Sequence, residues 1–440
     1  MKKSQEKEPA FKGAITAFLA MLFVLMLSLV GALVESASVQ ITKNRKRADT
    51  ILALESTFAE YDRQMLEKYD LFVRNGCSEA ILEERLAYYG AEHMLHAIRR
   101  QERLTDNNGT PFREQAIRYA KSWLGVDATL PESEYEFYSD TYLEEEELVY
   151  MDMKELLSQE EGELPEEGNP ISAVQRLKNT NLLTLVCERP EELSQRSIII
   201  ENLPSGRGLK EGNWERRASS GGSDKLFFAA YLTEHFGNMV SPDEVRALLY
   251  EQEYLLGGYA SDKENLEKVC KEILSIRMVV NYGYLLTDTT RQAEAEALAL
   301  TLCSLLTVPG ITEVVKHALL LAWAYAESIV DVRVLLKGKK VSLIKSTDTW
   351  QLQLVNLVKL GTDEEVVSEA DASGGLSYQN YLTGLLAMES EEALSMRSLD
   401  LIEGNLQIRT DECMTKVEIQ SKVELRRGVK DSFTTTFTYE

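Results

Sequence analysis

Histidine and cysteine are scarce in this chain, and neither forms a recognisable site. There are four histidines and five cysteines among 440 residues. No HExxH pattern and no CxxC pair occurs, so the common zinc-binding patterns are unfilled. A GxSxG elbow, a GxGxxG turn and a P-loop ending in GK[ST] are also missing, and with them the usual signs of a serine hydrolase or a nucleotide-binding protein. We therefore predict no catalytic residue, no cofactor and no metal.

Positive charge is in deficit. The chain has 48 Lys and Arg against 71 Asp and Glu, a formal net charge of -23. Such a surface repels a phosphate backbone, which argues against nucleic acid as a partner. Fifteen of the acids lie between Leu130 and Gly168, against the single Lys154. This acidic insert lacks the ligand spacing of an EF-hand, so we interpret it as a solvated linker or exposed helix, with a cation-binding segment as the alternative.

One segment carries no charge at all over 22 positions. At about 1.5 Å per residue, a helix of this length spans roughly 33 Å, enough for a hydrocarbon core of about 30 Å. We predict a transmembrane helix over 13–34 and a lipid bilayer as its partner. The residues that we take to mark the anchor are Gly13, Phe18, Leu25, Leu29 and Val34.

The orientation of the anchor is not decided by flanking charge. Four basic residues precede the span and four follow it, namely Lys2, Lys3, Lys7, Lys12, Lys43, Arg45, Lys46 and Arg47. Because long domains translocate regardless of local charge, we predict an uncleaved signal anchor with residues 1–12 in the cytoplasm and the large domain outside. A cleaved secretory signal, with a small-residue site at 36–38, is the competing interpretation. The second basic cluster is expected near lipid headgroups.

Beyond the span, apolar residues recur at steps of three and four and so form one stripe along a helix. The stripe consists of Ile51, Leu54, Phe58, Tyr61, Met65, Tyr69 and Phe72. We expect the membrane helix to continue outward, unbroken to Val73, for about 90 Å in all. The stripe packs either against neighbouring subunits, which leaves a homo-oligomer open, or against the chain's own ectodomain.

The remaining pattern is mainly α, with minor β at the C-terminus. Helices are predicted over 110–125, 169–187, 223–237, 262–286, 289–306 and 311–336, with capping boxes beginning at Ser241 and Ser261. A short strand is predicted over 197–203, and a terminal β-hairpin turning near Gly428. Residues 318–326 are apolar throughout but too few to span a membrane, so we predict a buried core helix. The domains are a tail (1–12), the span (13–34), a juxtamembrane helix (35–75), a helical segment (76–129), the acidic insert (130–168), a helical ectodomain (169–410) and the hairpin (411–440).

Two weaker signals concern chemistry. His93 and His96 stand three residues apart, which on a helix would bring both near one metal ion, but no third ligand has a defined spacing. The odd number of cysteines excludes a complete disulfide framework within one chain. An ordinary packing or surface role is the better interpretation of the histidine pair.

The stretch from Lys12 to Phe18, the apolar run after it and Glu35 at its outer end resemble the membrane segment of TadE/TadG-like, pilin-related proteins of the tight-adherence (Tad) pilus system. In that pattern a glutamate usually follows the glycine, whereas this chain has Thr16 and Phe18 there. Longer stretches resemble a family of clostridial membrane proteins related to that group. These are 69–72, 250–257, 265–286, 375–382 and 399–403.

The resemblance implies a cell-surface role alongside pilus machinery. We therefore expect a single-pass, non-enzymatic component or accessory of a Tad-like pilus or surface assembly, with protein partners in the envelope. The alternatives are a membrane-tethered hydrolase of envelope material, with a site built from residues distant in sequence, and a cation sensor that uses the acidic insert.

Overall fold

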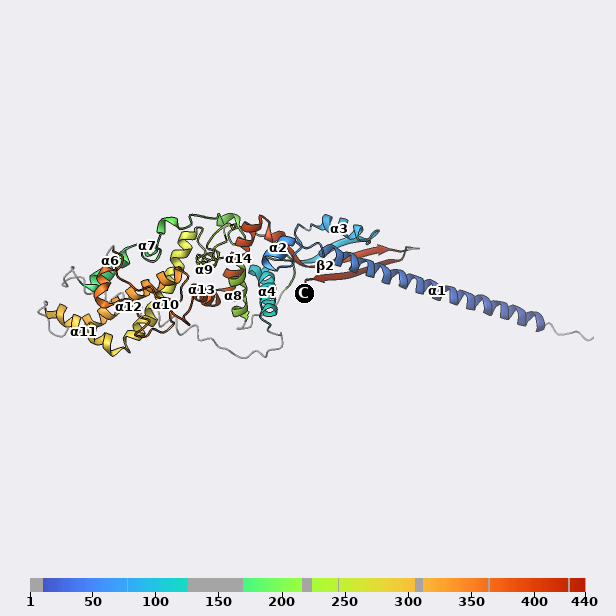
Figure 1. The fold of residues 1–440 in the computed structure, drawn as a ribbon. Coiled ribbons are helices and arrows are strands. Elements are labelled where there is room, and N and C mark those ends of the chain that lie inside the picture. Colours follow the sequence, from blue (N-terminus) through green and yellow to red (C-terminus); the bar gives the residue numbers. More distant parts are fainter. Residues whose placement is uncertain are drawn as a thin grey trace, which may run out of the picture.

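A computed structural model describes residues 11–76, 78–125, 169–215, 224–243, 245–304, 312–362, 365–425 and 428–439. The acidic insert and the tail 1–10 lie outside these residues. The protein is mainly helical with a small C-terminal antiparallel hairpin, as predicted. Figure 1 shows a long N-terminal helix, a small sheet beside its second half, and a helical head at the far end from the apolar segment.

Helix α1 (Phe11–Phe58) is 48 residues long and continues the apolar segment without interruption past residues 36–38. The prediction that it runs to Val73 is wrong. The side chain of Asp62 accepts hydrogen bonds from the backbone N–H groups of Gln64 and Met65, which caps a new helix, α2 (Arg63–Tyr69). The chain then reverses, and Asp62 N–H donates to the carbonyl of Val73 at 2.8 Å. The long helix therefore ends 15 residues before Val73, and a side-chain cap begins a new helix after it.

Three antiparallel strands form one sheet in the order β1 (Leu95–Arg103), β2 (Met414–Glu424) and β3 (Lys430–Thr438). The predicted hairpin is confirmed, and Gly428 in its turn has a φ of 74°. The expectation that 76–129 is all helical is wrong at β1. Its sequence has one β-branched residue, Ile98, and it becomes a strand by pairing with β2, some 320 residues later in the chain.

The sheet has its own small core. The last turns of α1 and helix α3 (Glu79–Tyr88) pack on one face of the sheet, and α4 (Asp106–Trp123) follows β1 into the head. The core residues alternate along the strands as a half-buried sheet requires. They are Ala53, Leu54, Phe58, Leu82, Leu86, Ala91, Met94, Met414, Val417, Ile419 and Val423.

The head contains the larger core, and α12 is buried along most of its length within it. Residues 318–326 of α12 are buried except for Tyr325, which confirms the predicted core helix. The helices of the head are α6 (Pro170–Asn179), α7 (Leu182–Val186), α8 (Asp224–His235), α9 (Glu251–Gly257), α10 (Asp262–Leu285), α11 (Thr289–Ser304), α12 (Thr312–Leu336), α13 (Tyr378–Met388) and α14 (Glu391–Leu406). Short 3-10 turns are η1 (Pro190–Glu192), η2 (Ile200–Asn202), η3 (Leu354–Lys359) and η4 (Thr410–Glu412).

Four predicted helices correspond to α8, α10, α11 and α12 within two residues at each described end. The helix predicted over 169–187 is broken instead, because Asn181 caps the separate helix α7. The predicted strand 197–203 is wrong, since Ser197 makes a single bridge and 200–202 is a 3-10 turn. The capping box predicted at Ser261 is also wrong, because the Ser261 side chain makes no capping hydrogen bond. Asp262 beside it instead accepts hydrogen bonds from Ser194 Oγ and from the N–H groups of Leu249 and Tyr250.

Candidate functional site

The predicted anchor segment forms the exposed half of α1. From Ile15 to Val34 every side chain of the helix is exposed, including those of Phe18, Leu25, Leu29 and Val34. Gly13 lies in the first turn of α1. Within the described part of the chain, α1 is the one helix long and apolar enough to cross a membrane. Its length and composition are consistent with a membrane anchor.

The predicted stripe divides into two groups. Leu54, Phe58, Met65 and Tyr69 are buried inside the protein's own cores. Ile51, Tyr61 and Phe72 stay 45%, 39% and 37% exposed. Because α1 ends at Phe58, the stripe lies on two helices, the turn between them and the segment after them. Four of its members therefore pack inside the chain's own folded body.

The basic cluster after the span contacts the hairpin. Lys43 Nζ and Arg47 Nη2 lie 3.2 and 3.4 Å from the carboxylate of Asp431 in β3. The guanidinium of Arg47 also lies over the ring of Phe433, 5.4 Å from its centroid. Lys46 Nζ donates to the carbonyl of Glu92 at 3.1 Å. Part of the cluster that we expected to face lipid thus fixes α1 to the sheet.

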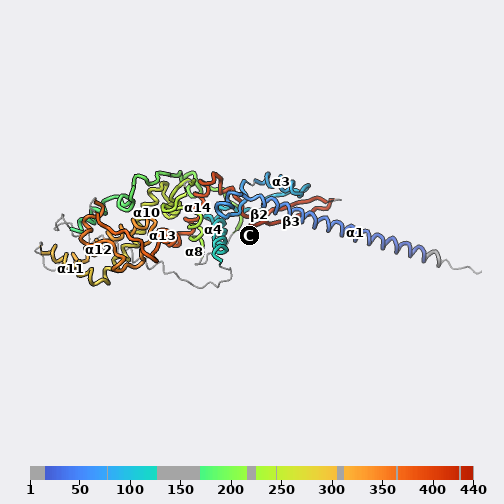
Figure 2. The backbone as a smooth tube through the Cα atoms, viewed as in Figure 1, coloured from blue at the N-terminus to red at the C-terminus, as the bar shows by residue number. Residues whose placement is uncertain are grey.

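A buried polar network joins α2 to the head. The hydroxyl of Tyr69 accepts hydrogen bonds from Arg246 Nη1 at 2.5 Å and from Asn405 Nδ2 at 2.9 Å. Asn405 also donates to the buried carboxylate of Glu251 at 2.6 Å. Burial, with the charge of Glu251 second, raises the pKa of Tyr69 to about 12, so the hydroxyl stays neutral. The network fixes α2 to the head, and Figure 2 shows the backbone of α1 running past the sheet toward it.

The two neighbouring histidines do not form a metal site. His93 sits in a turn with a φ of 60°, whereas His96 lies in β1 with its ring 2.9 Å from Ser421 Oγ and 3.2 Å from the carbonyl of Ala91. Burial lowers the pKa of His96, which favours the neutral ring. Among the described residues no group of three or more His, Cys, Asp or Glu is placed to hold a metal ion.

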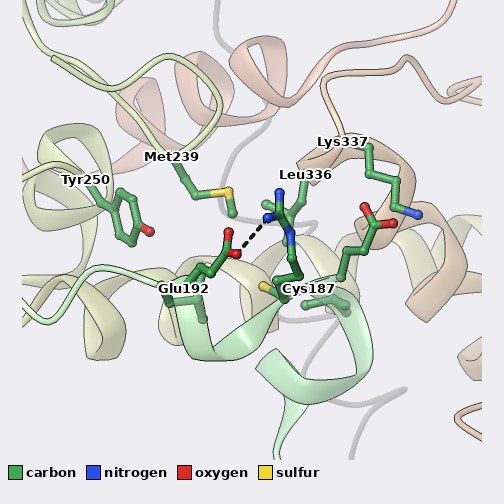
Figure 3. Close-up of a pocket in the computed structure, with 10 residues that line it drawn as sticks. Cys187, Glu192, Met239, Tyr250, Leu336 and Lys337 are labelled. Carbon is green, nitrogen blue, oxygen red and sulfur yellow. Dashed lines mark hydrogen bonds and ion pairs between the residues drawn. The ribbon is translucent and has the colours of Figure 1, made fainter. Parts of the chain in front are cut away.

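A surface cavity of about 290 Å³ lies between the segment after α7 and the end of α12 (Figure 3). Cys187, Met239, Tyr250 and Leu336 line it, and an ion pair between Arg189 and Glu192 of 2.6 Å crosses its wall. Burial raises the pKa of Cys187 to about 11, so its sulfur is a protonated thiol at neutral pH and a weak nucleophile. No histidine lines the cavity.

Sequence reasoning missed a cluster of four buried charges in the head. Lys345 Nζ lies 2.6 Å from both Glu327 and Asp331, and Arg277 Nε lies 3.0 Å from Asp331. The second oxygen of Glu327 accepts the N–H of Leu352 at 2.8 Å, which holds the segment 345–352 onto α12. The one signal in the sequence was a pair of acids four residues apart in an apolar helix. The cluster therefore fixes this segment to α12.

The four described cysteines are free and buried, and Cys77 lies outside the described residues. No disulfide forms among the described residues. The lowest-exposure thiols, Cys270 and Cys413, have a pKa raised by burial. These cysteines therefore act as core residues.

A family model matches residues 160–425, more than half of the chain. The chain belongs to DUF5702, a family of unknown function. The part shared with the family comprises most of the helical head and β2. The anchor, β1 and β3 lie outside it. No curated protein and no solved structure matches the chain.

Proposed function

We propose that this member of DUF5702 is a single-pass, membrane-anchored surface protein and a non-enzymatic component or accessory of a Tad-like pilus or surface assembly. In this proposal the N-terminus is cytoplasmic and the sheet and head lie outside the cell. The observation that carries it is the continuity of α1, which is bare and apolar in its first half and built into the sheet in its second.

Mechanical coupling supports the assembly part. Phe58 and the Lys43–Asp431 pair bind α1 to the sheet, and Tyr69 binds α2 to the head. A force or displacement applied to the anchor is transmitted to the head through packed side chains rather than through a flexible linker. This is the property that a structural subunit needs. The resemblance of the anchor region to TadE/TadG-like proteins supplies the pilus part of the proposal.

The chemistry of the cavity beside Cys187 supports a non-enzymatic role. A nucleophile-dependent hydrolase needs an activated group beside a base in a cleft. In the cavity beside Cys187 the thiol is protonated and lacks a histidine partner, and the clustered charges of the head are buried.

Thiol labelling tests the topology. In intact cells, a Glu55→Cys variant should react with a membrane-impermeant maleimide, because Glu55 is exposed on α1 beyond the span. A Ser4→Cys variant should react only after lysis. The reverse pattern would contradict the orientation. Deletion of the gene should abolish or reduce surface pili, and normal pili in the deletion strain would contradict the assembly role.

A further inference from the structure

One edge of strand β3 has no hydrogen-bonded strand beside it among the described residues. Leu425 N–H donates to the carbonyl of Val429 at 2.7 Å, and Tyr439 N–H donates to that of Thr415 at 3.4 Å. These two bonds show which residues of β3 form hydrogen-bonded pairs with β2, and they are the odd-numbered ones. The even-numbered residues direct their N–H and C=O groups outward. They are Lys430, Ser432, Thr434, Thr436 and Thr438, and no described residue bonds to these outward backbone groups.

The opposite edge of the same sheet is covered. Asn213 donates its backbone N–H to the carbonyl of Gln101 at 3.0 Å, and its side-chain Oδ1 accepts the N–H of Gln101 at 2.8 Å. Its Nδ2 also donates to the carbonyl of Arg99 at 2.9 Å. Protection of one edge and not of the other marks β3, a nine-residue strand rich in Thr and Phe, as the edge open to pairing.

Apolar side chains flank this open edge. Ile51 is four residues after Arg47 and seven before Phe58, so it shares their helix face, and those two contact Phe433 and Phe437 of β3. At the other end, the rings of Tyr61, Phe72 and Tyr439 follow one another with centroids 5.4 and 5.9 Å apart. The three exposed stripe residues therefore offer contacts for alternate side chains of an added strand.

Basic side chains lie at both ends of the edge in an otherwise acidic protein. Arg47 and Lys430 are exposed at one end. At the other, Arg118 Nη1 donates to the carbonyl of Tyr439 at 3.4 Å. The residues between, from Ser432 to Thr438, carry no charge. An added segment with acidic residues at its ends and none in its middle complements this distribution.

A second copy does not fit this edge. Asp431 lies against Lys43 and Phe437 against Phe58, so α1 and β3 run in the same direction (Figure 2). Identical edges related by a two-fold axis pair antiparallel, which would point the two anchors in opposite directions. Two copies in one bilayer cannot adopt that arrangement. This step rests on the anchor of the proposed function, whereas the open edge does not.

We propose that the outer edge of β3 is a strand-addition site for an extended segment of a different protein. The segment adds as a fourth strand, with main-chain hydrogen bonds to the even-numbered residues, apolar side chains at alternate positions toward Ile51, Tyr61 and Phe72, and acidic residues at its ends.

The probe that tests this is a fluorescent synthetic peptide, Glu-Val-Thr-Val-Thr-Val-Thr-Val-Glu, titrated into the full-length protein in detergent and followed by anisotropy. Proline at Thr434 or Thr436 removes an outward N–H and leaves the bonds to β2 intact. We expect Thr434→Pro and Thr436→Pro to weaken binding at least tenfold, and the matched Thr434→Val and Thr436→Val to bind as the native chain does. Equal melting temperatures check that the proline variants fold.

The same peptide with Lys in place of both Glu residues should bind at least tenfold more weakly. Equal binding by the proline and valine variants, or by both peptides, would overturn the proposal.

Hydrogen exchange over 430–438 identifies another occupant. Protection without peptide that rises with protein concentration would indicate a second copy, and protection lost when 130–168 are deleted would indicate the chain's own insert. Either result would overturn it. The detergent assay is independent of topology, so its failure and that of the proposed function are distinguishable.

Discussion

The ring of Phe58, in the last turn of α1, stacks on the ring of Phe437 in β3 with centroids 4.5 Å apart. The hydroxyl of Tyr439 donates to the carbonyl of Phe58 at 2.6 Å, which satisfies a carbonyl at the end of the helix. The two contacts join the first structured element of the chain to the last. The long helix is therefore part of the folded domain and not a detachable tail.

Replacing Phe58 with Ala should lower the free energy of unfolding by about 3–5 kcal/mol, because it leaves a cavity where a fully buried ring packed. Urea denaturation followed by circular dichroism measures the change. Ile51→Ala is the matched control on the same helix, and since Ile51 is 45% exposed it should cost less than about 1 kcal/mol. Equal losses for the two variants would contradict the assigned core.

Lys345→Met should destabilise the head by about 3–5 kcal/mol, because it leaves the buried carboxylate of Glu327 without a cation and that of Asp331 with Arg277 alone. The control is Arg189→Met, which removes an ion pair of 2.6 Å whose two side chains are more than half exposed. That change should cost at most about 1 kcal/mol. Thermal unfolding of both variants in the same buffer tests the difference. A loss of stability for Lys345→Met no larger than that for Arg189→Met would show that the charged side chains around Lys345 are not desolvated.

Glu253 gives the protein a pH-dependent stability. Burial raises its pKa to about 7, although its carboxylate accepts hydrogen bonds from Met239 N–H at 2.9 Å and Tyr378 Oη at 2.8 Å. The folded state holds the proton of Glu253 more tightly than the unfolded state does. Its stabilising contribution to the free energy of unfolding is therefore full below about pH 4.5 and is lost as the pH rises through 7. The loss amounts to about 3 kcal/mol.

Glu253→Gln should remove this dependence, because the amide has the shape of the protonated acid and does not titrate. Denaturant unfolding at pH 5 and pH 8 should therefore show a smaller fall in stability for the variant than for the native chain. A parallel fall in both proteins would assign the pH dependence to other groups.

Arginine in place of both Leu25 and Leu29 should reduce membrane retention, since each charged residue near the centre of a spanning helix costs about 2.5–3.5 kcal/mol on insertion scales. The measurement is the fraction of full-length protein that stays in the membrane pellet after an alkaline carbonate wash. Ile41→Arg is the control, because Ile41 is 68% exposed on α1 but lies beyond the predicted span. Unchanged retention of the double variant would contradict the anchor.

Local patterns predicted the elements that depend on local physics. The 3.6-residue period and the end signals located α8, α10, α11 and α12, and alternation with a turn glycine located the hairpin. β1 was missed because its strand state comes from pairing with β2, far along the chain. The break after Phe58 was missed because the stripe keeps its spacing across the loop, so periodicity alone does not reveal that Asp62 caps a second helix.

The sequence by itself determined that an uncharged segment of 22 residues must avoid water and that an acidic, mainly helical body follows it. Hydrophobicity and helical period are properties of neighbouring residues, so no tertiary contact is needed to read them. Only the tertiary structure decided which stripe residues are buried, where Lys345 finds its two carboxylates, and which sheet edge stays open. Those outcomes depend on contacts between residues hundreds of positions apart, where the pairing partner and not the local pattern sets the energy.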